Sequence, residues 1–156
     1  MALVAPYSKY RRNNLTILIV VCLVCAGWFY KDGYHNEEFI AKHTQEDGTA
    51  DSTLAFNQKS PPIFLAGAII SGILLFVVKG RKIVAQESEL VIDGKKKIAY
   101  DSIQQIDKTN LDPDGIKGYF VLTYKNVAGN EEHEKISAKS YDNLPAIVGE
   151  LASKIS

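Results

Sequence analysis

The sequence has no excess of either charge, because its 18 lysine and arginine residues balance 18 aspartate and glutamate residues. Proteins that bind nucleic acids usually carry a clustered basic surface, and no such cluster stands out along this chain. A nucleophile elbow with an associated His and Asp is also missing, as is any other recognisable catalytic constellation. We therefore expect no nucleic-acid binding, no cofactor and no enzymatic activity.

Cysteine is scarce, and its two copies lie close together at Cys22 and Cys25. Their C-x-x-C spacing is typical of redox and metal sites. Thiolate chemistry, however, needs a polar environment, whereas Val21, Leu23 and Val24 surround these thiols with hydrocarbon. We interpret both cysteines as small packing residues and expect no metal or redox site there.

Long uncharged runs occur only twice, at residues 15–30 and 63–78. At about 1.5 Å per residue each run spans about 24 Å, slightly less than a ~30 Å hydrocarbon core. The flanks favour a membrane, since Trp28 and Tyr30 suit the interface and Lys79 can reach the headgroups. The sequence thus predicts two membrane-spanning helices and the loop between them, at residues 15–30, 61–79 and 31–60.

Two other interpretations of these runs are weaker. A pair of buried core helices would need a soluble partner core that 156 residues can hardly supply. A cleaved signal peptide fits the basic start of the first run, but the bulky exit from Trp28 to Tyr30 lacks the small residues that a peptidase requires. We therefore expect the first segment to be retained as a helix.

The charges that flank the two runs predict their orientation. Residues 1–14 form a tail with three cations and no acid, and the second run leads into Lys79, Arg81 and Lys82. The connector at 31–60 carries six acidic residues against three lysines. Because positive residues near membrane ends stay in the cytoplasm, we expect a membrane hairpin with both termini cytoplasmic and the acidic connector outside.

Small residues recur at helical spacing in both runs. Small side chains let neighbouring helix backbones approach closely in a membrane. We therefore predict a helix-packing face that consists of Cys22, Ala26, Gly67, Ala68, Ser71 and Gly72. The neighbouring helix is either the other helix of the hairpin or a helix of a partner subunit.

The connector contains His35 and His43 among several acidic residues. Strong zinc motifs space their ligands two to five residues apart, and these histidines are eight residues apart. A hydrated acidic loop is the favoured interpretation, with one short helix at 36–42, and no metal site is expected.

After residue 80 the pattern changes to an alternation of apolar and polar residues, which predicts half-buried strands. Turn signals such as Asp93-Gly94 separate them. Six strands are expected, at 82–85, 89–92, 97–100, 103–108, 120–124 and 132–138. Apolar residues at helical spacing then run from Leu144 to Ile155, so we expect the chain to close with an amphipathic helix.

The run Glu89-Leu-Val-Ile-Asp-Gly-Lys-Lys-Lys-Ile-Ala-Tyr-Asp-Ser-Ile-Gln-Gln-Ile-Asp107 resembles the opening of bacterial PH-like domains, which are often attached to short membrane hairpins. The closing amphipathic helix is also similar to that family's, and the resemblance covers about half the chain. It implies a small α+β domain at 80–156, in which a bent antiparallel β-sheet is closed by a C-terminal helix. It brings no catalytic residues.

Together with the resemblance, these features predict a non-enzymatic, membrane-anchored interaction module in a bacterial inner membrane. We expect it to be an accessory or scaffolding subunit of a complex there, with membrane-protein partners. The alternative is a lipid or envelope sensor, because basic residues near a membrane surface are attracted to anionic headgroups. Its candidate headgroup contacts are Lys79, Arg81, Lys82, Lys95, Lys96 and Lys97. For the run at 95–97, a solvated hairpin is the simpler interpretation.

Overall fold

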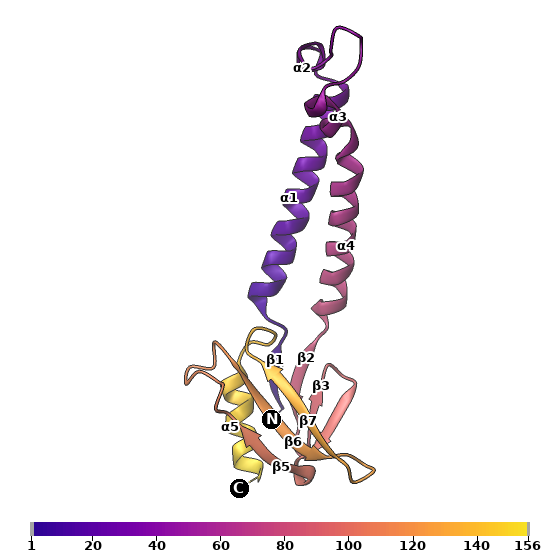
Figure 1. The fold of residues 1–156 in the computed structure, drawn as a ribbon. Coiled ribbons are helices and arrows are strands. Elements are labelled where there is room, and N and C mark those ends of the chain that lie inside the picture. Colours follow the sequence, from indigo (N-terminus) through magenta and orange to yellow (C-terminus); the bar gives the residue numbers. More distant parts are fainter. Residues whose placement is uncertain (1, 156) are drawn as a thin grey trace. The chain divides into compact units, whose positions relative to one another are not determined.

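The structure is a computed structural model that describes residues 2–155 (Figure 1). Two long apolar helices pack together near the N-terminus, and antiparallel β-sheets and a C-terminal helix follow them. The predicted α+β arrangement is therefore confirmed. The chain divides into two compact units, of which one is Asn13–Phe76 and the other combines the segments before and after it.

Two helices are long and apolar enough to cross a membrane, α1 (Lys9–Tyr34) and α4 (Pro61–Lys79). α4 has the predicted bounds, whereas α1 extends beyond the predicted 15–30 at both ends. The extension consists of polar residues, which continue a helix although they do not belong in hydrocarbon. With 26 residues, α1 is about 39 Å long at 1.5 Å per residue and exceeds a ~30 Å hydrocarbon core.

The connector contains two short helices, α2 (Glu37–Lys42) and α3 (Ser52–Lys59). α2 begins where predicted, since the Asn36 side chain accepts the Phe39 N–H at 3.2 Å. The sequence did not predict α3 and assigned a break at Asp51-Ser52. Asp51 instead accepts the Leu54 N–H at 2.8 Å, and a carboxylate at this position starts a helix as well as it ends a loop.

The outer end of the hairpin is closely packed at Gly33, which is buried. A Cβ built on Gly33 would lie 2.9 Å from the Asn57 carbonyl carbon, so α1 and α3 approach backbone to backbone. The Gln58 side chain donates to the Gly33 carbonyl at 3.2 Å, and the Tyr34 hydroxyl donates to the Gln58 carbonyl at 3.0 Å. Only glycine permits this approach without a shift of one backbone.

The second unit contains two antiparallel sheets. A four-stranded sheet has the order β1 (Leu3–Pro6), β2 (Lys82–Ala85), β3 (Glu89–Ile92) and β4 (Lys96–Ala99), and a three-stranded sheet has the order β5 (Ile103–Asp107), β6 (Tyr119–Lys125) and β7 (Glu131–Ser137). The six strands after α4 match the predicted ones to within one residue at each end. β4 ends early because Tyr100 begins the single turn η1 (Tyr100–Ser102).

The first residues are not the tail that the sequence suggested. Leu3 to Pro6 form β1, which pairs antiparallel with β2, so that Leu3 lies opposite Ala85 and Ala5 opposite Ile83. Ala5 is completely buried. Four residues without clear alternation carry too weak a local signal to predict a strand, and β1 exists because β2 offers it a free edge.

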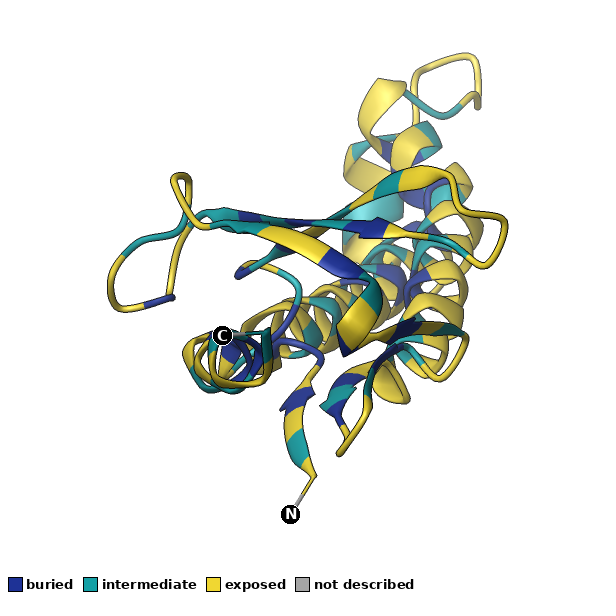
Figure 2. Ribbon diagram, turned by 90° about the horizontal axis from the view of Figure 1, so that it is seen from below, coloured by how far each residue is buried: buried dark blue, intermediate teal, exposed yellow. Residues whose placement is uncertain are grey.

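One hydrophobic core lies between the sheets and α5 (Leu144–Ile155). α5 places Leu144, Ile147 and Leu151 in this core with no exposed surface, and it contacts β1, β2 and η1. Burial alternates along β6, whereas β3 has three consecutive buried residues; Figure 2 colours the strands by burial. The period of two residues arises because successive strand side chains point to opposite faces.

Candidate functional site

The predicted helix-packing residues divide into two groups. Cys22 and Ala26 on α1 and Ala68 and Ser71 on α4 are buried. A Cβ built on Gly67 would lie 3.5 Å from the Cys22 Sγ, in ordinary van der Waals contact. Small residues thus occupy positions where α1 and α4 meet at short range.

Gly72 does not belong to this contact, because nothing lies within 4 Å of a Cβ built there. Gly67 and Gly72 are five residues apart, and at 3.6 residues per turn they point in directions about 140° apart. The hairpin therefore uses Gly67 and leaves the Gly72 notch open. If α4 spans a membrane, this open position would let another helix approach closely.

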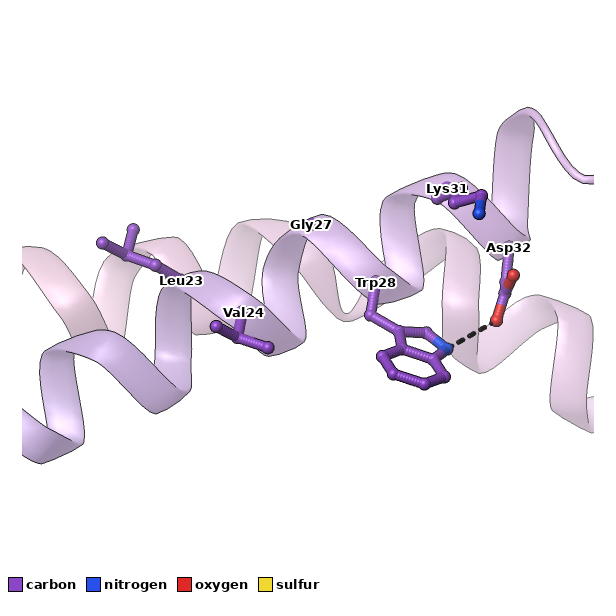
Figure 3. Close-up of a pocket in the computed structure, with 6 residues that line it drawn as sticks. All are labelled: Leu23, Val24, Gly27, Trp28, Lys31 and Asp32. Atoms are coloured by element: carbon purple, nitrogen blue, oxygen red, sulfur yellow. Dashed lines mark hydrogen bonds between the residues drawn. The ribbon is translucent and has the colours of Figure 1, made fainter.

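A groove lies on another part of α1, as Figure 3 shows. Its lining residues are Leu23, Val24, Gly27, Trp28, Lys31 and Asp32, and its volume is about 370 Å³. The Trp28 indole N–H donates to the Asp32 carboxylate at 2.7 Å. The sequence pattern places Trp28 at the interface but does not indicate the groove, although the four-residue spacing of Trp28 and Asp32 is a signal that the two side chains meet.

Four side chains meet where the chain enters and leaves the hairpin, and we call them the Arg81 cluster: Tyr7, Arg81, Asp93 and Tyr141. The Arg81 guanidinium donates to the Asp93 carboxylate at 2.7 and 2.6 Å, and the Tyr141 hydroxyl donates to the same carboxylate at 2.9 Å. The guanidinium also lies 5.7 Å from the Tyr7 ring centroid and 5.9 Å from that of Tyr141. The two ring centroids are themselves 6.2 Å apart, so one carboxylate holds a cation beside a pair of aromatic rings that contact each other edge to face.

Backbone hydrogen bonds reinforce the Arg81 cluster. The Tyr7 N–H donates to the Arg81 carbonyl at 3.0 Å, the Ser8 N–H to the Ser140 carbonyl at 2.9 Å, and the Asp142 N–H to the Pro6 carbonyl at 2.9 Å. The chain from Pro6 to Ser8 is thereby attached both to the segment between α4 and β2 and to the segment that precedes α5.

The electrostatics of the Arg81 cluster favour a structural role at neutral pH. Burial, and then the Asp93 carboxylate, raise the pKa of Tyr141 to about 12. The hydrogen bond to Asp93 raises the pKa of Arg81. Tyr141 therefore stays protonated and Arg81 stays charged, so neither group exchanges a proton at neutral pH.

The candidate headgroup contacts are also divided by the structure. Arg81 pairs with Asp93, Lys97 lies 3.1 Å from Glu89, and Lys96 lies 2.5 Å from Glu134. The remaining three are exposed, and no ion pair to them occurs within residues 2–155: Lys79, Lys82 and Lys95. Half of the predicted cations therefore already have a carboxylate partner.

In the acidic connector, His43 pairs with the carboxylate of Asp51. His43 Nδ1 lies 2.8 Å from Asp51 Oδ2. The Leu54 N–H, and then His43, lower the pKa of Asp51. Over the described part of the chain, no group of three or more His, Cys, Asp or Glu side chains is arranged to hold a metal ion.

Comparison with protein families, with characterised proteins and with solved structures gives no match to this chain. Its function is therefore inferred from its own sequence and geometry.

Proposed function

We propose that this protein is a non-enzymatic, membrane-anchored interaction module, an accessory or scaffolding subunit of a complex in a bacterial inner membrane. The observation that carries the proposal is the pairing of β1 with β2. β1 precedes the first apolar helix and β2 follows the second. One folded domain thus incorporates both ends of the hairpin, which a simple tether would not require.

The short connections strengthen this argument. Only Tyr7 and Ser8 separate β1 from α1, and only Gly80 and Arg81 separate α4 from β2. Hydrogen bonds within the Arg81 cluster hold both connections. Both connections are thus part of the β unit, which suits a subunit whose domain and membrane helices act on one partner.

The strand pairing also supports the topology. Since β1 and β2 belong to one sheet, the chain enters and leaves the hairpin on the same side of the membrane. Lys9, Arg11 and Arg12 at the entry and Lys79 and Arg81 at the exit favour the cytoplasm for that side. The acidic connector then lies outside.

A PH-like fold for the domain gains support from its strand count. β1 adds a seventh strand to the six expected after the hairpin. Sheets of four and three antiparallel strands, closed by α5, agree with the bent sheet and closing helix of that family. The PH-like domain is the part to which we assign protein binding on the cytoplasmic side.

Two measurements test the proposal. Reporter fusions should place residue 45 outside and residue 156 in the cytoplasm, and a C-terminal fusion active only in the periplasm would contradict the topology. Gentle solubilisation of the tagged full-length protein should then recover the same membrane proteins repeatedly. Gly72→Leu should reduce that recovery, because it fills the open notch on α4, whereas Ile73→Leu, at an exposed neighbouring position, should not.

A lipid sensor is the second candidate function, and the exposed Lys79, Lys82 and Lys95 favour it. Each cation near an anionic surface contributes about 1 kcal/mol. If this function holds, replacing these three lysines by glutamine should weaken binding of added anionic vesicles to the detergent-solubilised full chain. At high salt the variant and the unchanged protein should bind the vesicles equally, because salt screens the charges. Equal binding before and after the replacement would exclude it.

A further inference from the structure

The groove on α1 has an apolar floor and two opposite charges at one end (Figure 3). Leu23, Val24 and Gly27 form the floor. Nothing lies within 4 Å of a Cβ built on Gly27, so the floor is open. Lys31 and Asp32 lie one turn further along the helix, towards the connector.

One wall of the groove is held in place. Trp28 is 66% exposed, and an exposed side chain normally samples several rotamers. Here its indole N–H donates to Asp32 Oδ2 at 2.7 Å, and the Asn36 amide donates to Asp32 Oδ1 at 3.0 Å. The ring and the carboxylate are therefore positioned before any ligand binds.

We propose that this groove binds one phospholipid whose headgroup carries both a phosphate and a primary ammonium group. An acyl chain lies over Gly27 against the Trp28 ring, the phosphate pairs with Lys31, and the ammonium pairs with Asp32. Each Asp32 oxygen accepts one hydrogen bond, from Trp28 or from Asn36, and retains a second lone pair for the ammonium. The inference rests on the proposed function in one respect, that α1 spans the membrane.

Charge complementarity favours a lipid over a partner helix as the occupant. Lys31 and Asp32 are adjacent and of opposite sign, which matches a zwitterionic headgroup. A protein helix placed over them would remove both charges from water, and desolvation of an ion pair commonly offsets its attraction. A headgroup leaves both charges at the wet interface, where Trp28 also belongs.

Trp28 is the only tryptophan of the chain, so its fluorescence reports on this groove directly. The full-length protein is placed in phosphatidylcholine nanodiscs that contain a small fraction of lipid with brominated acyl chains, which quench indole fluorescence on contact. Brominated phosphatidylethanolamine should associate about fivefold more strongly than equally brominated phosphatidylcholine, the effect expected of one additional charge-assisted contact near the surface.

Two variants locate the effect. Asp32→Asn keeps an oxygen that accepts the indole N–H but removes the charge, so it should abolish the preference for phosphatidylethanolamine. Gly27→Leu fills the floor and should reduce quenching by every brominated lipid. Gly72→Leu on α4 and Lys79→Gln at the other end of the hairpin are the matched controls, and both should leave the quenching unchanged.

Three outcomes would overturn the inference alone, and a fourth would overturn the proposed function with it. Equal quenching by both zwitterionic lipids would indicate ordinary contact with bulk lipid. Stronger quenching by brominated phosphatidylglycerol would indicate that Lys31 alone selects an anionic lipid. Weak quenching by all lipids, in a protein whose reporter fusions show the expected topology, would indicate that another protein covers the groove. Weak quenching together with reporter fusions that contradict the topology would remove the proposed function as well.

Discussion

The Lys96 ammonium lies 2.5 Å from the Glu134 carboxylate and 5.2 Å from the Tyr124 ring centroid. Lys96 is on β4 of the four-stranded sheet, and Glu134 is on β7 of the three-stranded sheet. The same contact therefore connects the two sheets. Glu132, also on β7, extends the network. Its carboxylate accepts a hydrogen bond from the Tyr124 hydroxyl and lies 3.9 Å from the Lys96 ammonium. The hydrogen bond to Glu134 raises the pKa of Lys96, so the cation persists throughout the neutral range.

Lys96→Gln should destabilise the β unit, because it leaves Glu134 without its counter-charge. The Lys96 side chain is 39% exposed, so solvent screens the pair and the loss should be about 1 kcal/mol in the free energy of unfolding. Denaturant unfolding of the full chain in detergent measures it. Lys95→Gln is the control, since Lys95 is exposed and should change stability by less than about 0.5 kcal/mol. Equal losses in the two variants would contradict the role of Lys96.

Ala5→Glu should unfold or open the four-stranded sheet, although residue 5 precedes the whole hairpin. Ala5 has no exposed surface and lies opposite Ile83. Burial of an unpaired carboxylate costs several kcal/mol, a large share of the ~5–15 kcal/mol that stabilises a domain. Amide hydrogen exchange of β2 in the full-length protein measures the effect. Val4→Glu at the neighbouring position, which is 41% exposed, should leave exchange nearly unchanged, and equally fast exchange in both variants would exclude the β1 pairing.

Stability should fall in the alkaline range because of Tyr141. Its pKa is raised from 10.0 to about 12 in the folded protein, so folding favours the protonated form. The contribution of Tyr141 to the free energy of unfolding is complete below pH 10 and is lost as the pH rises through 12. A pKa shift of this size corresponds to about 2–3 kcal/mol. In denaturant titrations between pH 9 and 12, the free energy of unfolding should fall less steeply for Tyr141→Phe than for the unchanged protein. Parallel curves would show that Tyr141 does not titrate with folding.

Gly33→Val should loosen the outer end of the hairpin. Its Cβ would lie 2.9 Å from the Asn57 carbonyl carbon, and a backbone atom cannot move aside as a flexible side chain can. Overpacking of this kind typically costs about 1–3 kcal/mol. Faster amide exchange across α3 is the expected readout. Gly27→Ala is the control, because its Cβ meets nothing within 4 Å; slower or unchanged exchange in Gly33→Val would refute the close approach.

Local patterns were sufficient for most of the secondary structure. The strand from Tyr119 to Lys125 is visible in the sequence because Phe120, Leu122 and Tyr124 alternate with less buried residues. α5 is visible because its apolar residues follow the helical period. The two apolar runs likewise needed only their own composition. Each of these signals is contained in a window shorter than about twenty residues.

The long-range contacts of the fold depend on partners distant in the sequence. β1 needs the free edge of β2, Lys96 needs Glu134, and Arg81 needs Asp93. A run of three lysines looks the same whether its members face a lipid headgroup or a carboxylate on another sheet. Charge alone therefore predicted six headgroup contacts, and the fold pairs three of them internally.

The sequence by itself thus determined the elements of this protein, two apolar helices, a strand-rich segment and a closing amphipathic helix, because periodicity and composition are local properties of the chain. Only the tertiary structure decided that the first residues complete the sheet, that Gly67 is packed while Gly72 is open, and that Trp28 and Asp32 shape a groove. The physical reason is that a contact depends on the direction and surroundings of a side chain, and folding brings residues on either side of a long hairpin to the same place.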